Sequence, residues 1–422
     1  NITKRMNRNE AVSQQYQKKS HLEHIKERPD TYIGSCESRQ EFLWVFNDDR
    51  MEYRQVEYVP GLLKIFDEIL VNAADNKQRD NSMKTIRVTV QTDRITVEND
   101  GRGIPIVMHE KENMWVPQMV FGELLTGDNY DDSSDRVVGG RNGYGAKLAN
   151  IFSSVFCVET VDSQAGQSYA QQWKNNMAKV STPIIKKSGK RKDFTRITFV
   201  PDFEKFGLEK IDADTLALFQ KRVYDIAGTT ASDVRVYFNG VRLPVQNFKQ
   251  YCSLYFKDDQ PIVYEKINDR WEVGVTVSLD QQAHQVSFCN SICTTNGGEH
   301  VKCILDNISK RLVSHRNFKD LKVKASQIRL STFVFVNALI TNPSFDSQTK
   351  ETLTTRSNNF GPANFKPVIS NKFAAGIIKR TGIIEEVLFY ARAKSNRALQ
   401  RATASRKTSK LFGIPKLDDA TH

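Results

Sequence analysis

The segment GLLKIFDEILVNAADNKQR, residues 61–79, carries the strongest structural pattern in the sequence. Its apolar residues recur at helical spacing and Pro60 precedes it, so the segment predicts an amphipathic helix. On that helix Glu68, Asn72 and Asp75 fall within about 60° of arc on one face. This acid–amide–acid stripe is either a solvated surface or the wall of a pocket. The positions that would face a core are Leu62, Phe66, Ile69 and Ala73.

A short glycine-containing turn follows two expected strands, at 85–91 and 94–99. It reads Asn99-Asp100-Gly101-Arg102-Gly103. Two glycines at i and i+2 after a strand would let the backbone approach a flat ligand closely. A plain tight turn is the alternative, and the residues of this turn alone do not decide between the two.

A long polar loop is expected over 122–145, because this stretch is rich in Gly, Asp, Asn and Ser. It runs into GGRNGYGAK, residues 139–147, and a helix is expected to begin near Ala146. Four glycines before a helix start expose backbone N–H groups that suit a phosphate, although a hinge loop is the alternative. The segment is not a Walker A loop, because no GK[ST] follows, nor a dinucleotide fingerprint, because the third glycine is missing.

The rest of the pattern divides the chain into two units of mixed α and β structure. Strands expected at 155–161, 194–200 and 234–238 lead to a hairpin turn at Asn239-Gly240, and we place a boundary near 244. In the second unit the expected strands are 271–279, 284–289 and 331–338, and the expected helices are 299–313 and about 369–402. The domains are then an arm at 1–27, a first unit at 28–244, a second unit at 245–402 and a polar linker at 403–422.

Composition excludes several classes of protein. The 422 residues are 39% hydrophobic and 26% charged, which is enough to bury a core and argues against disorder. The longest apolar stretch, 333–340, is too short to cross a bilayer, and no charged-then-apolar leader opens the sequence. Six cysteines without CxxC spacing predict reduced thiols in an intracellular protein. Seven histidines without an HExxH pattern argue against a structural zinc.

Positive charge is concentrated in the C-terminal part of the chain. The formal net charge is +12. Residues 302–330 sum to +6 and residues 372–410 to +8, so the rest of the chain sums to −2. Clustered Lys and Arg are typical of a surface that binds a phosphate backbone. A solubilising surface is the alternative, and charge alone leaves both open.

Taken together and in this order, the ExxxNxxD helix, the NDGxG turn and the GxxGxG loop resemble the ATP-binding Bergerat fold of the GHKL superfamily. Three segments, 64–76, 139–147 and 346–351 (DSQTKE), more specifically resemble eukaryotic DNA topoisomerase II. The resemblance extends from about Tyr16 to Asp419. It implies an α/β (α+β) fold: a GHKL two-layer sandwich with a mixed sheet, followed by a transducer domain like the second domain of ribosomal protein S5.

The same resemblance implies ATP and Mg²⁺ as cofactors and assigns roles to individual residues. Glu68 would activate water, Asn72 would hold Mg²⁺, and Lys350 would reach the γ-phosphate from the second domain. Asn99 and Gly103 would take the adenine, and Asn129 the ribose. The other residues implied at the nucleotide are Asp75, Gly127, Asp128, Gly140, Arg141, Asn142, Gly143, Tyr144, Gly145, Ala146, Lys147, Gln348 and Thr349.

Partners follow from the resemblance as well. It implies a nuclear protein that forms an ATP-dependent homodimer, with Tyr16 reaching the partner's nucleotide, and that closes around double-stranded DNA without sequence preference. The residues that would face DNA are Ser314, His315, Arg316, Lys319, Lys322 and Lys324. No DxDxD cluster is present, so we expect ATP hydrolysis and dimerisation but no DNA cleavage by this chain alone.

One departure from the family pattern keeps two alternatives open. Gly127-Asp128 stands where the family usually has two small hydroxyl residues, and a carboxylate beside a triphosphate would repel it. A clamp that binds ATP without hydrolysing it is therefore one alternative. Another GHKL ATPase, such as a MutL-like protein, is the other, and the segments 139–147 and 346–351 disfavour it.

Overall fold

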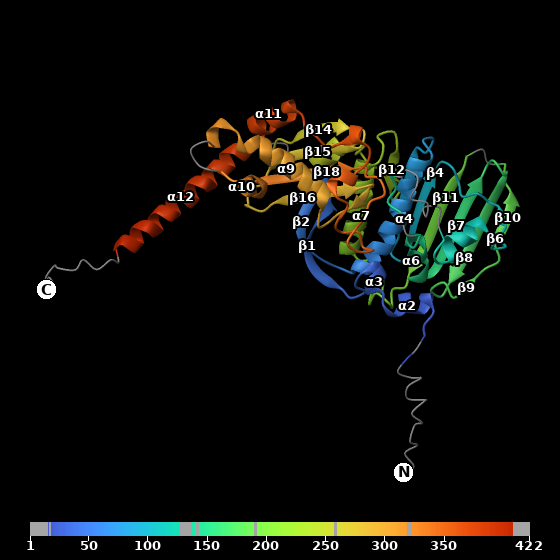
Figure 1. Ribbon diagram of the computed structural model, residues 1–422. Coiled ribbons are helices and arrows are strands. Elements are labelled where there is room, and N and C mark those ends of the chain that lie inside the picture. The colour runs from blue at the N-terminus through green and yellow to red at the C-terminus, as the bar shows by residue number, and fades with distance from the viewer. Residues whose placement is uncertain are drawn as a thin grey trace, which may run out of the picture.

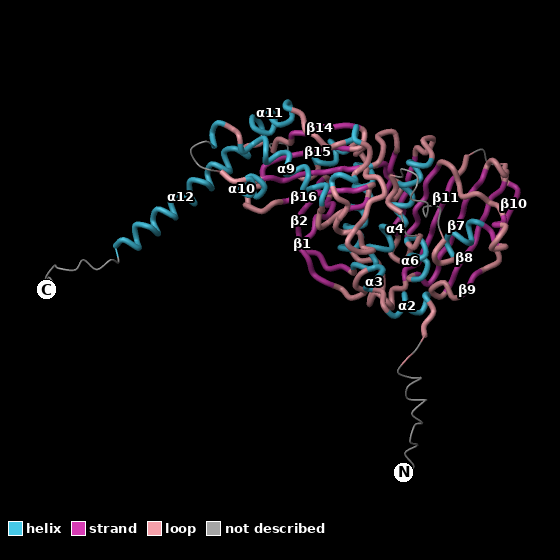
Figure 2. Tube along the Cα trace, in the orientation of Figure 1, coloured by secondary structure: helices cyan, strands magenta, loops and turns pink. Residues whose placement is uncertain are grey.

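The computed structural model describes residues 16, 18–126, 137–140, 143–189, 192–256, 260–318 and 323–407. Two separate mixed sheets dominate this part of the chain, one in each half of the sequence, and helices pack against both (Figures 1 and 2). This confirms the expected mixed α/β architecture. None of the helices in the described residues is both long and apolar enough to cross a membrane.

Nine strands of the described residues form the first sheet, in the order β10-β8-β7-β11-β4-β3-β12-β13 with β9 beside β8. Only β12 and β3 pair in parallel; the other neighbours are antiparallel. The strands are β3 Thr85–Val90, β4 Ile95–Asp100, β7 Ser153–Asp162, β8 Gln167–Lys174, β9 Lys179–Val180, β10 Ile184–Lys187, β11 Phe194–Pro201, β12 Arg235–Phe238 and β13 Val241–Arg242.

The helices of the first half pack against this sheet and against one another, with α4 in contact with both α6 and α7. They are α2 His21–Glu27, α3 Asp30–Ile33, α4 Pro60–Arg79, α5 Val116–Gly122, α6 Gly145–Ile151 and α7 Ala213–Thr229. Helix α8 Phe248–Ser253, just after the expected boundary, packs on α7. Two small antiparallel pairs complete this half: β1 Arg39–Asn47 with β2 Arg50–Tyr58, and β5 Met108–His109 with β6 Met114–Trp115.

The second sheet has the order β14-β15-β18-β16-β17, with β16 and β18 parallel. Its strands are β14 Val263–Asn268, β15 Trp271–Val277, β16 His284–Cys289, β17 Ile292–Cys293 and β18 Thr332–Ala338. The helices beside it are α9 Glu299–Val313, η1 Arg316–Phe318, α10 Ala325–Leu330, η2 Ser357–Asn359, η3 Ala363–Phe365, α11 Asn371–Arg380 and α12 Ile383–Lys407. The far end of α12 projects away from the body (Figure 1).

Burial explains why α4 and β18 occupy central positions. Helix α4 starts with Pro60 in its first turn and buries apolar residues around most of its circumference, among them Leu62, Ile65 and Leu70. Every residue of β18 is buried, as expected for a strand covered on both faces. The longest apolar stretch of the sequence is thus a central strand.

The largest apolar core continues from the first half into the second sheet, and the second half has a further core of its own. Phe66 of α4 stacks on Phe219 of α7, and the same buried cluster includes Phe288 and Phe335 from the second sheet. Aromatic pairs of this kind add about 0.5–1.5 kcal/mol each beyond the area that they bury. The junction between the halves is therefore a packed interface, and α4 lies next to it (Figure 1).

Most of the expected elements are present, and one is wrong. The helix expected over 61–79 is α4, and Asn239-Gly240 forms the hairpin turn between β12 and β13. The single helix expected over about 369–402 is instead two helices, α11 and α12. Gly382 has φ +76°, a left-handed conformation that ends helices, so the chain turns there. Helix α12 then continues past the expected end to Lys407.

Candidate active site

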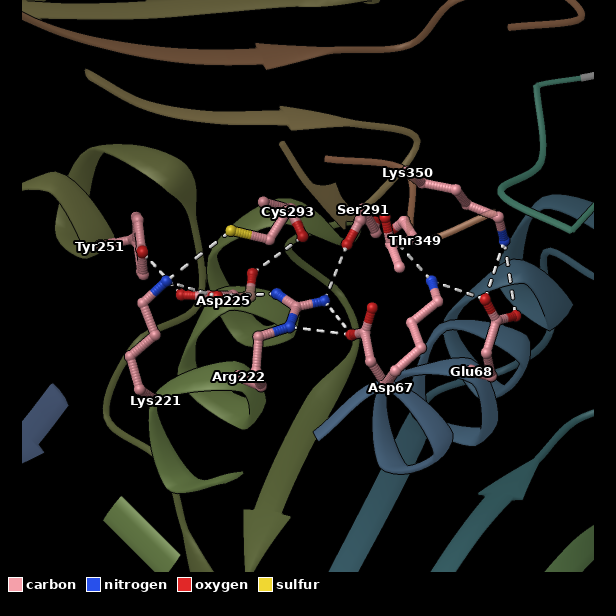
Figure 3. A network of polar contacts seen from close by, with 12 residues as sticks. Asp67, Glu68, Lys221, Arg222, Asp225, Tyr251, Ser291, Cys293, Thr349 and Lys350 are labelled. Carbon is pink, nitrogen blue, oxygen red and sulfur yellow. Dashed lines mark hydrogen bonds and ion pairs between the residues drawn. The ribbon is translucent and has the colours of Figure 1, made fainter. Parts of the chain in front are cut away.

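Glu68 pairs with two buried lysines at one end of the polar network drawn in Figure 3. Its side chain is 4% exposed. Lys64 Nζ, one turn earlier on α4, is 2.7 Å from Glu68 Oε1. Lys350 Nζ, from the loop beyond β18, is 3.1 Å from Oε1 and 3.4 Å from Oε2. The structure therefore brings together the two residues expected to be catalytic, and adds a second lysine.

The two ammonium groups control the charge of Glu68. Burial on its own would raise the pKa of this carboxyl, but Lys350 and Lys64 outweigh it and lower the pKa to about 2. Burial lowers the pKa of Lys64, an effect that Glu68 opposes and Lys350 reinforces. At neutral pH Glu68 is thus firmly ionised and paired.

Gly145, the first residue of α6, packs directly on the Glu68 carboxylate. A Cβ atom added at Gly145 would lie 2.1 Å from Glu68 Oε2. No larger residue fits without moving the carboxylate. The last glycine of the GxxGxG pattern therefore has a packing reason, which the sequence alone did not suggest.

Asp75, the second acid of the stripe, anchors the start of the glycine loop. Its carboxylate accepts hydrogen bonds from the Gly139 N–H at 2.9 and 3.0 Å and from the Gly140 N–H at 2.9 Å. Burial raises the pKa of Asp75 to about 6, even though these hydrogen bonds act in the opposite direction. Gly139 itself is wedged between the halves, because an added Cβ would meet Val71 at 2.8 Å and Ile292 at 3.1 Å.

Asn72 differs from the two acids, because its side chain is exposed. It lies one turn after Glu68 on α4. Its amide oxygen is a hard ligand of the kind that Mg²⁺ accepts, usually together with water and phosphate oxygens. The exposed amide beside an ionised carboxylate therefore fits the expected metal. In the described residues no three His, Cys, Asp or Glu side chains gather into a metal site of their own.

The turn after β4 packs against backbone carbonyl groups, one of its own and one of β7. Asn99 is buried, and its Nδ2 donates to the Asp100 carbonyl at 2.9 Å. An added Cβ at Gly103 would lie 2.0 Å from the Val161 carbonyl oxygen, so glycine is required there by packing on β7. Two hydroxyls missed in the sequence lie nearby: Thr195 pairs in register with Asn99, and Thr160 Oγ1 is 3.2 Å from Thr195 Oγ1. Nothing in the strand pattern sets these threonines apart.

Lys147 and Tyr144 fix the end of the glycine loop. Lys147 is buried, and its Nζ donates to the Gly143 carbonyl at 2.6 Å and to the Thr126 carbonyl, so it ties together the two sides of the long loop. The Tyr144 hydroxyl is 3.3 Å from His21 Nε2, which places α2 against the loop. Ala146 is buried beside them.

The segment that carries Lys350 is a tight turn. Lys350 has φ +64°, and its N–H donates to the Ser347 carbonyl at 3.2 Å. The Thr349 carbonyl accepts a hydrogen bond of 3.2 Å from Lys64 Nζ, while Gln348 is half-buried. This turn is therefore bonded to α4 by two lysines, one from each half.

A second buried network joins α4, α7 and the second sheet, and it was not expected from the residue pattern (Figure 3). Arg222 donates from Nε to Asp67 Oδ1 at 2.8 Å, from Nη1 to Asp225 Oδ2 at 2.7 Å and from Nη2 to the Ser291 carbonyl at 3.4 Å. Lys221 pairs with Asp225 at 2.8 Å. Burial would lower the pKa of Arg222, but Asp67 and Asp225 outweigh it and raise the pKa.

Several predicted residues lie away from this cluster. Tyr16 is 75% exposed. Ser314, Arg316 and Lys324 are exposed and His315 is half-buried, around the end of α9 and the start of α10. The predicted residues outside the described ranges are Gly127, Asp128, Asn129, Arg141, Asn142, Lys319 and Lys322.

Each half of the chain matches a known protein family. Residues 58–201 match the family of histidine kinase-, DNA gyrase B- and HSP90-like ATPases, and residues 247–407 match the DNA gyrase B family. DNA topoisomerase 2 of Bombyx mori is 48% identical over 97% of this chain, and human DNA topoisomerase 2-beta is 47% identical over 97%. The chain spans 27% and 26% of the length of these two relatives.

Solved structures cover the same region. The ATPase region of Saccharomyces cerevisiae topoisomerase II is 49% identical, with a TM-score of 0.85 over 90% of this chain and 100% of that one. The ATPase and transducer domains of DNA topoisomerase II from Balamuthia mandrillaris are 46% identical, with a TM-score of 0.87 over 91% and 99%. The chain therefore belongs to the eukaryotic DNA topoisomerase II family and corresponds to its ATPase region.

Proposed function

We propose that this chain binds and hydrolyses ATP with Mg²⁺ and serves as the nucleotide-operated gate of a type IIA topoisomerase. The observation that carries the proposal is the meeting of Glu68 on α4 with Lys350 from the other half. The Glu68 carboxylate supplies a base and the Lys350 ammonium supplies a cation. Because they come from the two halves of the chain, their contact also connects the halves mechanically.

Each residue then has a distinct task. The Glu68 carboxylate accepts a proton from the attacking water, and the Lys350 ammonium stabilises negative charge that develops on the γ-phosphate. Asn99 and Gly103 take the adenine, and the Gly140–Lys147 loop, which includes Gly143 and Tyr144, covers the phosphates. Gln348 and Thr349 place Lys350. Asn72 would hold Mg²⁺, which when bound neutralises charge on the phosphate oxygens.

The Lys350–Glu68 pair of the nucleotide-free chain would also make hydrolysis depend on bound nucleotide. A carboxylate with a pKa of about 2 is a weak proton acceptor. When Lys350 turns from Glu68 to the γ-phosphate, Glu68 loses one cation and its proton affinity rises. The γ-phosphate therefore activates Glu68 by drawing Lys350 away from it. Glu68 becomes a stronger proton acceptor only after ATP has bound.

The gate follows from the position of Lys350 in the second half. A γ-phosphate that holds Lys350 ties the second sheet to the first, and its loss frees them to reorient. We propose that ATP closes a homodimer through this change, that Tyr16 reaches the nucleotide of the other copy, and that double-stranded DNA is enclosed. The basic residues after α9 then form a lining without sequence preference. The nucleus is the proposed location, since the relatives are eukaryotic DNA topoisomerases.

Sedimentation velocity tests the gate directly. The chain is measured with a non-hydrolysable ATP analogue, with ADP and without nucleotide, each with Mg²⁺. A dimer with the analogue and a monomer with ADP are expected. The same oligomeric state in all three samples would contradict an ATP-driven gate.

Steady-state phosphate release separates a hydrolysing gate from an ATP-binding clamp. Release that depends on Mg²⁺ and is lost in Glu68→Gln supports the ATPase. Dimerisation with ATP but without phosphate release would favour the clamp. The MutL-like alternative is disfavoured by the matches to DNA topoisomerase 2 over nearly the whole chain.

A further inference from the structure

Lys64 has no role in the function proposed so far, although burying its charge is costly to the fold. It lies in the first turns of α4 among buried apolar residues, and its side chain is 7% exposed. Taking an ammonium group out of water costs several kcal/mol unless it is paired and hydrogen-bonded. Lys64 meets both requirements at one place, because its Nζ lies 2.7 Å from Glu68 Oε1 and donates to the Thr349 carbonyl at 3.2 Å.

We propose that Lys64 is a positioning residue for ATP hydrolysis, which holds the Glu68 carboxylate ionised and in place after Lys350 has left it for the γ-phosphate. The inference rests on the proposed function, and names a residue to which that function gives no role. Lys64 acts through Glu68 and need not touch the nucleotide itself.

When Lys350 leaves, Glu68 stays in a buried site with Lys64 beside it. Gly145 closes off the Oε2 side, and the carboxylate is nearly inaccessible to water. The charged groups near it are Lys350 from the second half, Lys64 on its own helix and, beyond Lys64, Asp67, which is paired with Arg222. Without either lysine, burial would favour the protonated acid, which cannot accept a proton.

Lys64 also connects the base to the movement of the Lys350 turn. Thr349, whose carbonyl Lys64 holds, is the residue directly before Lys350. A shift of this turn toward a bound phosphate changes the Lys64–Thr349 contact at the same time as the Lys350–Glu68 contact. The base thus registers the position of the second half through two lysines, one of which stays with it.

The test compares three substitutions in the full chain. Lys64→Met removes the charge but keeps the length, Lys64→Gln keeps a donor without charge, and Lys64→Arg keeps the charge. The control is Lys77→Met, because Lys77 is also a buried lysine of α4 with a carboxylate partner, Asp233, but lies about 20 Å along the helix from Lys64. Thermal unfolding of each variant establishes that it is folded.

The pH profile of kcat distinguishes positioning from mere structural support. In Lys64→Met and Lys64→Gln the acidic limb should move to higher pH by about one unit, which is tenfold in activity on that limb. The Kd for the non-hydrolysable analogue should change by less than about threefold. Lys64→Arg and Lys77→Met should keep the wild-type limb. A Lys64→Met profile that overlays the wild type after scaling would overturn the proposal.

A readout without turnover keeps the inference testable if the chain proves not to hydrolyse ATP. Infrared difference spectra against Glu68→Gln report protonation of the Glu68 carboxyl. In a Lys350→Met background, adding Lys64→Met should raise the pH at which this band titrates, whereas adding Lys77→Met should not. An unchanged titration refutes the role of Lys64, and absence of phosphate release by the wild type refutes the proposed function alone.

Discussion

Lys350 Nζ lies 3.1 Å from Glu68 Oε1, and the two residues are 282 positions apart in the sequence. Each side chain is almost fully buried, so neither charge is compensated by water. Breaking such a pair by removing one partner costs about 3–5 kcal/mol, because the other charge is left buried. The contact therefore fixes how the two halves meet, and a ligand that draws Lys350 away must supply a comparable attraction.

Glu68→Gln should abolish ATP turnover, by about 10²-fold or more, because the amide cannot accept the proton of the attacking water. It should also destabilise the nucleotide-free chain by a few kcal/mol, since Lys64 and Lys350 both lose their counter-charge. Nucleotide binding should be retained and should restore stability. Phosphate release, and thermal unfolding with and without the analogue, check both parts; a variant that turns over ATP normally would refute the base assignment.

Lys350→Ala should lower kcat by about 10²-fold or more, because it removes the cation that stabilises the γ-phosphate. The matched control is Lys302→Ala, which removes an exposed lysine of α9 in the same half. Turnover of the control should equal that of the wild type. If kcat of Lys350→Ala were also unchanged, Lys350 would be a structural partner of Glu68 and no more.

Gly145→Ala should lower turnover by about tenfold to a hundredfold, because the new methyl group would displace the Glu68 carboxylate and small misplacements of catalytic groups are costly. Gly189→Ala is the control, since an added Cβ there meets nothing within 4 Å. Single-turnover measurements at saturating ATP check the chemical step. Equal rates for the two variants would show that Gly145 is not in contact with a working base.

The sequence predicted those parts of the fold that have strong local periodicity. Helix α4 and strands β3 and β4 were expected close to their observed bounds, because buried positions recur at the period of each element. The break in the expected helix over about 369–402 was missed, because it depends on the left-handed φ of Gly382, which only the structure shows. Glycine tolerates helical and non-helical conformations alike, so one glycine does not reveal which is used.

The site could be predicted only in part, for a different reason. Helical spacing placed Glu68 in a stripe that was either solvated surface or the wall of a pocket. Its role as a base and the whole expectation for Lys350 came from the resemblance, because only the tertiary structure brings the two residues together. Lys64 and Arg222 were missed, since a buried ion pair and a solvated helix surface have the same residue types in a sequence. Gly103 and Gly145 were expected at the nucleotide, which stays a prediction. The structure adds a packing reason for each glycine, because an added Cβ would collide with the Val161 carbonyl at Gly103 and with the Glu68 carboxylate at Gly145.

The contribution of Asp75 to the free energy of unfolding should fall as pH rises. Most carboxyl groups behave in the opposite way, because folding lowers their pKa. Its pKa is raised by burial from 3.8 to about 6 in the folded chain. Between these values the folded state binds the extra proton, so the favourable contribution is complete below pH 4 and is lost as pH rises through 6. The size is about 3 kcal/mol, from about 1.4 kcal/mol per pKa unit.

Urea unfolding of wild type and Asp75→Asn between pH 4 and 7 isolates this effect. The stability of the wild type relative to the variant should fall by that amount across the range. Glu68 does not confuse the comparison, because its lowered pKa acts in both proteins and its contribution is lost only as pH falls below about 4.5 toward 2. A pH-independent difference would contradict a raised pKa for Asp75.

Arg222→Met should destabilise the chain by about 3–5 kcal/mol, because Asp67 loses a buried partner, whereas Asp225 keeps Lys221 and Tyr251. Adding Asp67→Asn should recover part of the loss, since the uncompensated carboxylate is then gone. Chemical unfolding of the two single variants and the double variant measures this coupling. Lys302→Met, which breaks an exposed pair, should change stability by less than about 1 kcal/mol. Strict additivity of the Asp67 and Arg222 changes would show that their contact does not bind α4 to α7.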